Sequence, residues 1–165
     1  MPIRDLVEAD LDAALALNNA AAPALNELDA VELARLHALA AHTLVAVDDS
    51  GGFAGFCLTL SQGAAYDSLN YRWFSTRYES FVYLDRIVVA PSQRSSGFGA
   101  ALYGELERRI AGNPRWLLCE VNVKPRNDGS LRFHDRLGFV EVGQQDTEGG
   151  KKRVSLLAKD LTAGR

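Results

Sequence analysis

The sequence has few cysteines, little net charge and no long apolar run. Its only cysteines, Cys57 and Cys119, lie inside apolar segments, so we expect two buried free thiols and no disulfide. The formal net charge of −3 lacks the basic excess of a general nucleic-acid binder. No apolar run approaches the roughly 20 residues of a membrane span, and residues 1–5 contain no signal-peptide core. We therefore expect a cytoplasmic protein without nucleic-acid or membrane partners.

What the sequence does contain is the composition of a globular domain. Its 165 residues, 47% of them hydrophobic, are enough to bury a core without a disulfide or a metal. His37 and His42 have no carboxylate or cysteine at a spacing that would complete a metal site. We expect a single domain over residues 1–165 that holds no metal.

Hydrophobic periodicity and turn residues predict alternating strands and helices. The order favours an α/β or α+β fold, in which a mixed sheet of about seven strands is flanked by about four helices. Asp128 is the expected N-cap of the last helix. The expected strands are residues 3–6, 43–47, 53–60, 81–90, 116–123, 139–144 and 153–159, and the expected helices are residues 10–21, one from about 29, 99–111 and 128–137.

Residues 62–80 form a long connection that is rich in aromatic side chains. Long connections in compact domains are often functional. Tyr71, Trp73 and Phe74 are candidates for the wall of a substrate pocket, and the alternative is a short helix that packs its aromatics into the core. The sequence leaves both interpretations open.

Residues 88–102 have the features of an anion-binding turn. A strand ends at Pro91, a polar turn follows, and Gly97 and Gly99 open a helix whose first N–H groups lack partners inside the helix. Arg94 adds a positive charge. The segment lacks the lysine of a P-loop, and Leu102 occupies the third glycine position of a dinucleotide fingerprint. We therefore expect a phosphate site of another kind.

Two motifs carry a resemblance to a known family. The pattern Arg-x-x-Gly-x-Gly at residues 94–99 resembles the turn that binds the acetyl-CoA pyrophosphate in GNAT acetyltransferases. Residues 127–139 resemble the second signature of that family, Asn-x-x-Ala-x-x-Leu-Tyr-x-x-x-Gly-Phe. The element order is also similar along nearly the whole chain. The Asp-Arg-Ile and Cys-Glu-Val-Asn strands resemble those of one bacterial group within the family.

The resemblance implies a GNAT fold with two splayed parallel strands, residues 81–90 and 116–123, and acetyl-CoA as co-substrate. Dimers are common in the family, so a homodimer is one expected state. A backbone N–H of the first strand would polarise the acetyl oxygen. The implied acetyl-CoA-binding residues are Ile87, Val88, Val89, Arg94, Ser95, Ser96, Gly97, Phe98, Gly99, Ala100, Asn127, Ser130 and Phe133.

Catalysis on an amine needs a base, and the second splayed strand offers one. Glu120 and Asn122 are two residues apart, so they face the same side of an otherwise apolar strand. Glu120 is a candidate base, and Asn122 is a candidate for substrate binding or for holding a water. Asp85 is an alternative base, or else the partner of Arg86 in a structural ion pair.

His134 stands where the family often has the tyrosine that protonates the leaving CoA thiolate. A histidine is chemically able to do this, since its ordinary pKa is near 6.5. The alternative is a helix histidine that contacts CoA or the core.

Together these features predict an acetyl-CoA-dependent N-acetyltransferase. It would transfer the acetyl group directly, in a ternary complex, to a primary amine of a small molecule or peptide. The alternative is a non-catalytic GNAT-like module that senses acyl-CoA or binds a partner, which His134 in place of tyrosine favours. A donor with a longer acyl chain is a third possibility.

Overall fold

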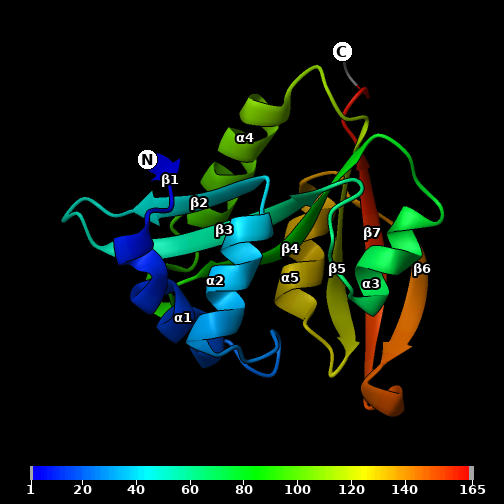
Figure 1. The fold of residues 1–165 in the computed structure, drawn as a ribbon, viewed down its shortest axis with the longest axis horizontal. Coiled ribbons are helices and arrows are strands. Elements are labelled where there is room, and N and C mark those ends of the chain that lie inside the picture. The colour runs from blue at the N-terminus through cyan, green and yellow to red at the C-terminus, as the bar shows by residue number, and fades with distance from the viewer. Residues whose placement is uncertain (1, 164–165) are drawn as a thin grey trace. The chain divides into compact units, whose positions relative to one another are not determined.

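The computed structural model describes residues 2–163, whose strands form one seven-stranded mixed sheet (Figure 1). The strand order is β1-β2-β3-β4-β5-β7-β6, and β4 is parallel to β5. The strands are β1 Ile3–Asp5, β2 His42–Val47, β3 Phe53–Ser61, β4 Phe81–Val89, β5 Trp116–Lys124, β6 Val140–Thr147 and β7 Lys152–Asp160. The helices are α1 Leu11–Ala20, α2 Ala30–Leu39, α3 Leu69–Ser75, α4 Phe98–Ile110 and α5 Asp128–Arg136.

The α/β fold and the seven strands confirm the sequence prediction. About four helices were expected, and the described residues form five. The additional helix is α3, inside the aromatic connection at residues 62–80. Its N-cap is Ser68, whose hydroxyl oxygen accepts a hydrogen bond from the backbone N–H of Tyr71.

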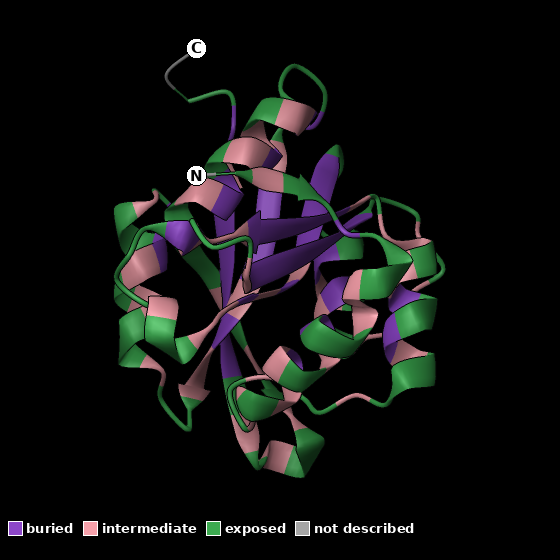
Figure 2. Ribbon diagram, turned by 90° about the vertical axis from the view of Figure 1, so that its left-hand side faces the viewer, coloured by how far each residue is buried: buried purple, intermediate pink, exposed green. Residues whose placement is uncertain are grey.

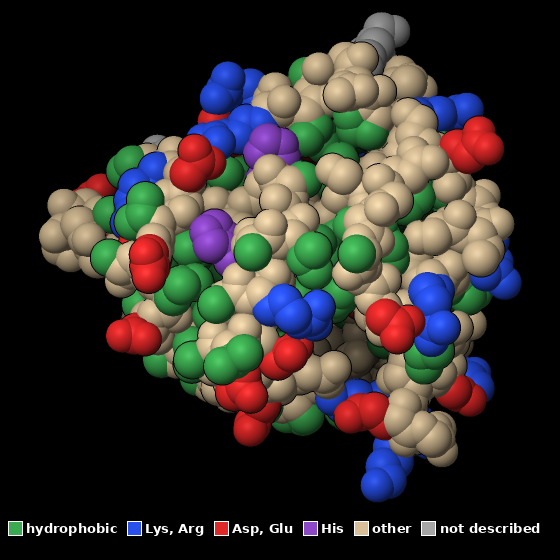
Figure 3. Space-filling view, in the orientation of Figure 1, with side chains coloured by type: hydrophobic (Ala, Val, Ile, Leu, Met, Phe, Trp, Pro, Cys, Tyr) green, Lys and Arg blue, Asp and Glu red, His purple; other side chains and the backbone are tan. Residues whose placement is uncertain are grey.

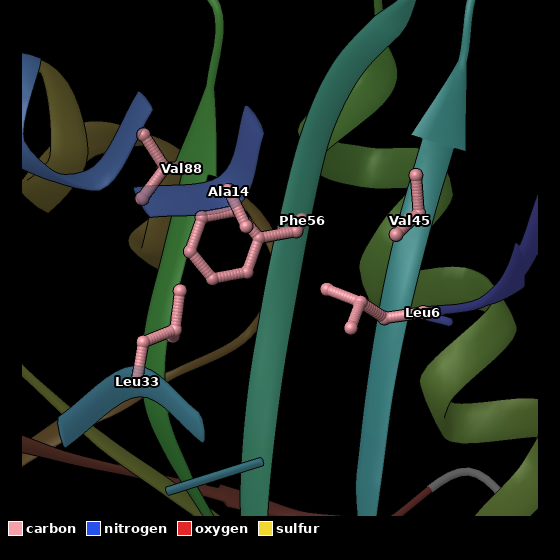
Figure 4. Close-up of a cluster of buried hydrophobic side chains, with 6 residues drawn as sticks. All are labelled: Leu6, Ala14, Leu33, Val45, Phe56 and Val88. Atoms are coloured by element: carbon pink, nitrogen blue, oxygen red, sulfur yellow. The ribbon is translucent and has the colours of Figure 1, made fainter. Parts of the chain in front are cut away.

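The chain folds as two compact units, the first made of residues up to 60 with residues 84–110. In this first unit α1 and α2 lie together over the strands, and α4 runs behind β2 (Figure 1). The Phe56 ring lies at the centre of an apolar cluster formed by side chains from α1, α2 and the strands (Figure 4). That cluster consists of Leu6, Ala14, Leu33, Val45, Phe56 and Val88.

The second unit contains residues 61–83 and the residues from 111 onward. Here β5 is antiparallel to β7, and β7 is antiparallel to β6. The parallel ladder joins Phe81, Val82 and Tyr83 of β4 to Trp116, Leu117 and Leu118 of β5. β5 and β7 are largely buried, whereas β6 is largely exposed; Figure 2 shows buried residues concentrated in the interior of the fold.

The strand register of the second unit defines two faces of its sheet. Glu120 on β5 pairs with Leu156 on β7, which pairs with Gly143 on β6. The Trp73 side chain of α3 lies against Gly143, where a Cβ atom would come within 2.6 Å of the indole ring. Since side chains two residues apart share a face, Glu120 and Asn122 point to the side of the sheet that α3 covers.

Candidate active site

The anion-binding turn lies in the first unit and has the backbone shape that its sequence predicts. A short 3-10 turn, η2 (Pro91–Gln93), follows β4, and Ser95 and Gly97 have positive φ angles of 67° and 87°. The first hydrogen bond of α4 runs from the N–H of Ala101 to the carbonyl of Gly97, at 2.9 Å. The preceding N–H groups, of Phe98, Gly99 and Ala100, therefore have no acceptor within the helix. This arrangement can hold an anion.

The side chains of the turn leave this backbone open. Arg94, Ser95, Ser96 and Gly97 are exposed, and Phe98 is buried and anchors the start of α4. On the face that Figure 3 shows, Lys and Arg side chains alternate with Asp and Glu, with no broad field of one sign. An anion would therefore be attracted by local groups rather than by the net charge.

Buried and partly exposed side chains alternate at the end of β4. Val88 is buried in the apolar cluster, while Ile87 and Val89 are partly exposed. The Asp85 carboxylate accepts a hydrogen bond from Arg86 at 2.7 Å, and both side chains are buried. Arg86 also donates to Asn18 of α1 at 2.8 Å. These contacts favour the structural ion pair over the alternative of Asp85 as a base.

The second unit holds Glu120 with a partner that the sequence analysis did not single out. The Tyr83 hydroxyl lies 2.7 Å from each carboxylate oxygen of Glu120 and donates its proton to that carboxylate. Tyr83 is 1% exposed, and Glu120 and Asn122 are half-buried. The signal in the sequence was a tyrosine within an apolar strand, because a buried phenol usually needs a polar partner.

The aromatic segment contributes mainly to the core of this unit. Tyr71 and Phe74 are buried, and the Tyr71 hydroxyl donates to the Ser61 carbonyl at 2.6 Å. Trp73 is partly exposed, and the Arg77 guanidinium lies 4.0 Å from the centre of its ring. The structure therefore shows the short core helix that was one of the two interpretations. Acceptor contact by these three aromatics stays a prediction.

The start of α5 uses its asparagine differently from the expectation. Asn127, not Asp128, is the N-cap, and its side-chain oxygen accepts from the N–H of Ser130 at 3.2 Å. Asn127, Ser130 and Phe133 are all half-buried. The Asp128 carboxylate instead pairs with Arg126 at the surface. A contact of these residues with acetyl-CoA stays a prediction.

His134 is buried on α5 among aromatic rings. Its Nδ1 lies 2.8 Å from the Ser130 carbonyl oxygen, which can only accept, so Nδ1 carries the proton. Burial lowers the pKa of His134, although the bond to Ser130 opposes this shift. The ring is therefore neutral at physiological pH, and its transferable proton is held by the backbone.

Both cysteines are buried free thiols, as expected. Burial raises the pKa of Cys57 to about 12, so this thiol is protonated at physiological pH. The described residues contain no group of three His, Cys, Asp or Glu side chains that could hold a metal ion. No helix among residues 2–163 has the length and apolar character needed to cross a membrane.

The burial of His134 predicts how stability depends on pH. Its folded-state pKa is depressed, so the unfolded chain binds more protons as pH falls below about 6.5, and stability is lost there. In the variant His134→Asn, whose amide can still donate to the Ser130 carbonyl, this loss should shrink by up to about 1.4 kcal/mol per pH unit. Urea unfolding of the wild type and of His134→Asn between pH 5 and 7.5 measures how the free energy of unfolding of each protein depends on pH. His42, whose pKa burial also lowers, contributes equally to both proteins, so an unchanged slope would contradict the prediction.

β4 and β5 are parallel, and a turn that can hold an anion lies between β4 and α4, so the chain is an α/β domain with a candidate anion site. Residues 9–139 match the model of the acetyltransferase (GNAT) family. This match covers more than half of the chain, which therefore belongs to the GNAT acetyltransferase family. None of the curated proteins matches the sequence.

Solved structures of acetyltransferases share this fold. The Salmonella typhimurium protein yncA, determined with its cofactor acetyl-CoA, has a TM-score of 0.71 at 20% identity, covering 100% of this chain and 96% of that one. The ribosomal-protein-S18-alanine N-acetyltransferase from Escherichia coli has a TM-score of 0.71 at 20% identity, with 99% and 96% covered. A spermidine N-acetyltransferase from Vibrio cholerae has a TM-score of 0.72 at 18% identity, with 98% and 95% covered. At these identities the likeness establishes the fold.

Proposed function

We propose that the chain is an acetyl-CoA-dependent N-acetyltransferase that acts as a single GNAT domain on a primary amine. The observation that carries this proposal is the Glu120 carboxylate, half-buried and held at 2.7 Å by the Tyr83 hydroxyl. A half-buried carboxylate on an otherwise apolar strand needs a reason, and accepting a proton from an amine is one. Membership of the acetyltransferase family supplies the matching chemistry.

The reaction would be a direct transfer. The amine nitrogen attacks the thioester carbonyl carbon, its proton passes to Glu120 directly or through a water held by Asn122, and the carbonyl electrons move to oxygen. A backbone N–H group would stabilise that oxyanion. The intermediate then collapses with cleavage of the C–S bond, and the CoA thiolate takes up a proton. The products are an acetamide and free CoA.

The first unit would supply the anion site of the co-substrate. The N–H groups at the start of α4 and the positive charge of Arg94 are of the kind that bind a pyrophosphate, which supports this role. We infer that acetyl-CoA is the donor because a solved structure of this fold contains it. The same fold serves a spermidine and a peptide-alanine acetyltransferase, so the proposed acceptor class is a polyamine-like or peptide amine.

Incubation of the purified chain with acetyl-CoA and a panel of amines tests the proposal. The panel would contain spermidine, an alanine-terminated peptide and simple primary amines. We expect free CoA thiol to appear with at least one acceptor, in step with the acetylated amine detected by mass spectrometry. A tertiary amine that cannot form a stable amide is the matched control. Hydrolysis of acetyl-CoA without acetylated product would not support the proposal.

A second candidate function is a non-catalytic sensor of acyl-CoA. The observation that favours it is His134, whose Nδ1 proton is bound to the Ser130 carbonyl and so is poorly placed to protonate a thiolate. Tight binding of acetyl-CoA by calorimetry, without turnover of any amine, would favour the sensor. Binding accompanied by turnover would favour the enzyme.

A further inference from the structure

The buried Tyr83 side chain places its hydroxyl 2.7 Å from both carboxylate oxygens of Glu120. We propose that Tyr83 orients the Glu120 carboxylate, and that Tyr71 and Phe74 act on catalysis by fixing the Tyr83 ring rather than by touching the acceptor. The inference rests on the proposed function, because it assigns a role towards the base of that reaction. All four side chains belong to the second unit.

The strand register brings the two polar groups together. Tyr83 pairs with Leu118 in the parallel ladder, and Glu120 lies two residues beyond Leu118 on the same face. Two residues span about 7 Å along a strand, a distance that a tyrosine side chain can bridge. The hydroxyl therefore reaches both carboxylate oxygens, at 2.7 Å each.

Two rings of α3 hold the Tyr83 ring in place. The Tyr71 ring lies at 5.4 Å with an interplanar angle of 72°, and the Phe74 ring lies at 5.9 Å with an angle of 50°. These are favourable aromatic contacts. Both side chains are buried, so the Tyr83 ring is enclosed on the α3 side.

Tyr71 is itself fixed by the segment before α3. Its hydroxyl donates to the Ser61 carbonyl at 2.6 Å and accepts from the N–H of Ala64 at 2.9 Å. Neither bond involves Glu120. The segment is thus tied to Tyr71, Tyr71 packs on Tyr83, and Tyr83 bonds to Glu120.

This chain of contacts matters for a base in a partly open site. A carboxylate on a two-carbon stem samples several rotamers when water is its only partner, and proton transfer needs one orientation. A hydrogen bond from a neutral donor to a charged acceptor is strong. The Tyr71 and Phe74 rings, which we call the aromatic frame, restrict rotation of the Tyr83 side chain. The aromatic frame therefore limits the orientations of the carboxylate before the acceptor arrives.

Kinetics of Tyr83→Phe, alone and combined with Glu120→Gln, test the proposal. The Phe ring keeps the packing and removes only the hydroxyl. We expect kcat to fall by about tenfold, as for the loss of a bond to a charged group, with an unchanged KM for acetyl-CoA. In the Glu120→Gln background the same change should have less than a twofold effect, because the group it positions is no longer a base.

Two further variants separate positioning from stability. Ser155→Ala removes a buried hydroxyl of the same unit that donates to Glu141 and not to Glu120, so it should lower the melting temperature and leave kcat within twofold. Phe74→Leu loosens the aromatic frame and leaves the Tyr83 hydroxyl in place, so it should lower kcat only where Glu120 is present. This second variant also serves if Tyr83→Phe does not fold.

The possible outcomes distinguish this inference from the proposed function. If Glu120→Gln slows the reaction but Tyr83→Phe matches the wild type, the positioning role is overturned and the proposed base stands. If Tyr83→Phe is equally harmful with and without Glu120, Tyr83 acts independently and the inference is likewise wrong. If Glu120→Gln is fully active, Glu120 is not the base, and the positioning role of Tyr83 is refuted as well.

Discussion

The variant Glu120→Gln is expected to lower kcat/KM for the acceptor amine by about 10²- to 10⁴-fold, the usual contribution of a general base. Gln has nearly the same shape as Glu, and its side-chain oxygen can still accept a hydrogen bond from the Tyr83 hydroxyl, whose oxygen lies 2.7 Å from Glu120 Oε1. It cannot take a proton from the amine. The variant therefore removes the proposed chemistry and keeps the packing of β5.

Initial-rate kinetics across pH, together with acetyl-CoA binding and melting temperature, measure this effect. We expect acetyl-CoA binding and melting to stay close to wild type. The acidic limb of the kcat/KM profile should disappear in the variant. Glu141→Gln is a matched control, because Glu141 lies on β6 of the same unit with its carboxylate bonded to Ser155. Wild-type rates at every pH in Glu120→Gln would remove Glu120 from the mechanism.

The fold was largely predictable because several of its strands are apolar runs bounded by turn residues. β4 and β5 show this most clearly, since few polar residues interrupt either strand. The helix α3 was only one of two interpretations of residues 62–80, because Leu69–Ser75 is too short to show helical periodicity. Its capping residue Ser68 was the available signal.

Contacts between residues close in the sequence could be predicted, whereas a contact between distant residues could not. The anion-binding turn is contiguous in sequence, so its glycines, its proline and Arg94 could be identified together. The ion pair of Asp85 with Arg86 joins neighbours and was among the interpretations considered. The bond between Tyr83 and Glu120 joins residues 37 apart, and only the register of a parallel ladder brings them together. A sequence does not specify that register.

The start of α5 illustrates a competition that sequence alone does not resolve. Asn127 and Asp128 are adjacent, and both are good N-cap residues. The structure selects Asn127, and Asp128 becomes the first residue of the helix, where its charge is favourable to the helix dipole. The Asn127 oxygen accepts a hydrogen bond from the N–H of Ser130, and its NH₂ group can donate to a ligand.

The variant Arg94→Glu is expected to weaken acetyl-CoA binding by about 10- to 100-fold, the range for losing a bond to a charged group. Arg94 is exposed beside N–H groups that have no acceptor within α4, so its side chain can approach a pyrophosphate without rearrangement of the core. Reversal of its charge also places a carboxylate against that anion. The effect should diminish as salt is raised, because the contact is at the surface.

Isothermal titration with two ligands identifies which part of the co-substrate Arg94 contacts. Acetyl-CoA carries the pyrophosphate, whereas acetylated pantetheine lacks all phosphates. We expect Arg94→Glu to weaken acetyl-CoA binding and to leave acetyl-pantetheine binding unchanged. Arg35→Glu changes the net charge by the same amount on α2, where Arg35 pairs with Glu32 at the surface, and so controls for the overall field. Equal weakening by both variants, or equal loss for both ligands, would place the anion site elsewhere than at the start of α4.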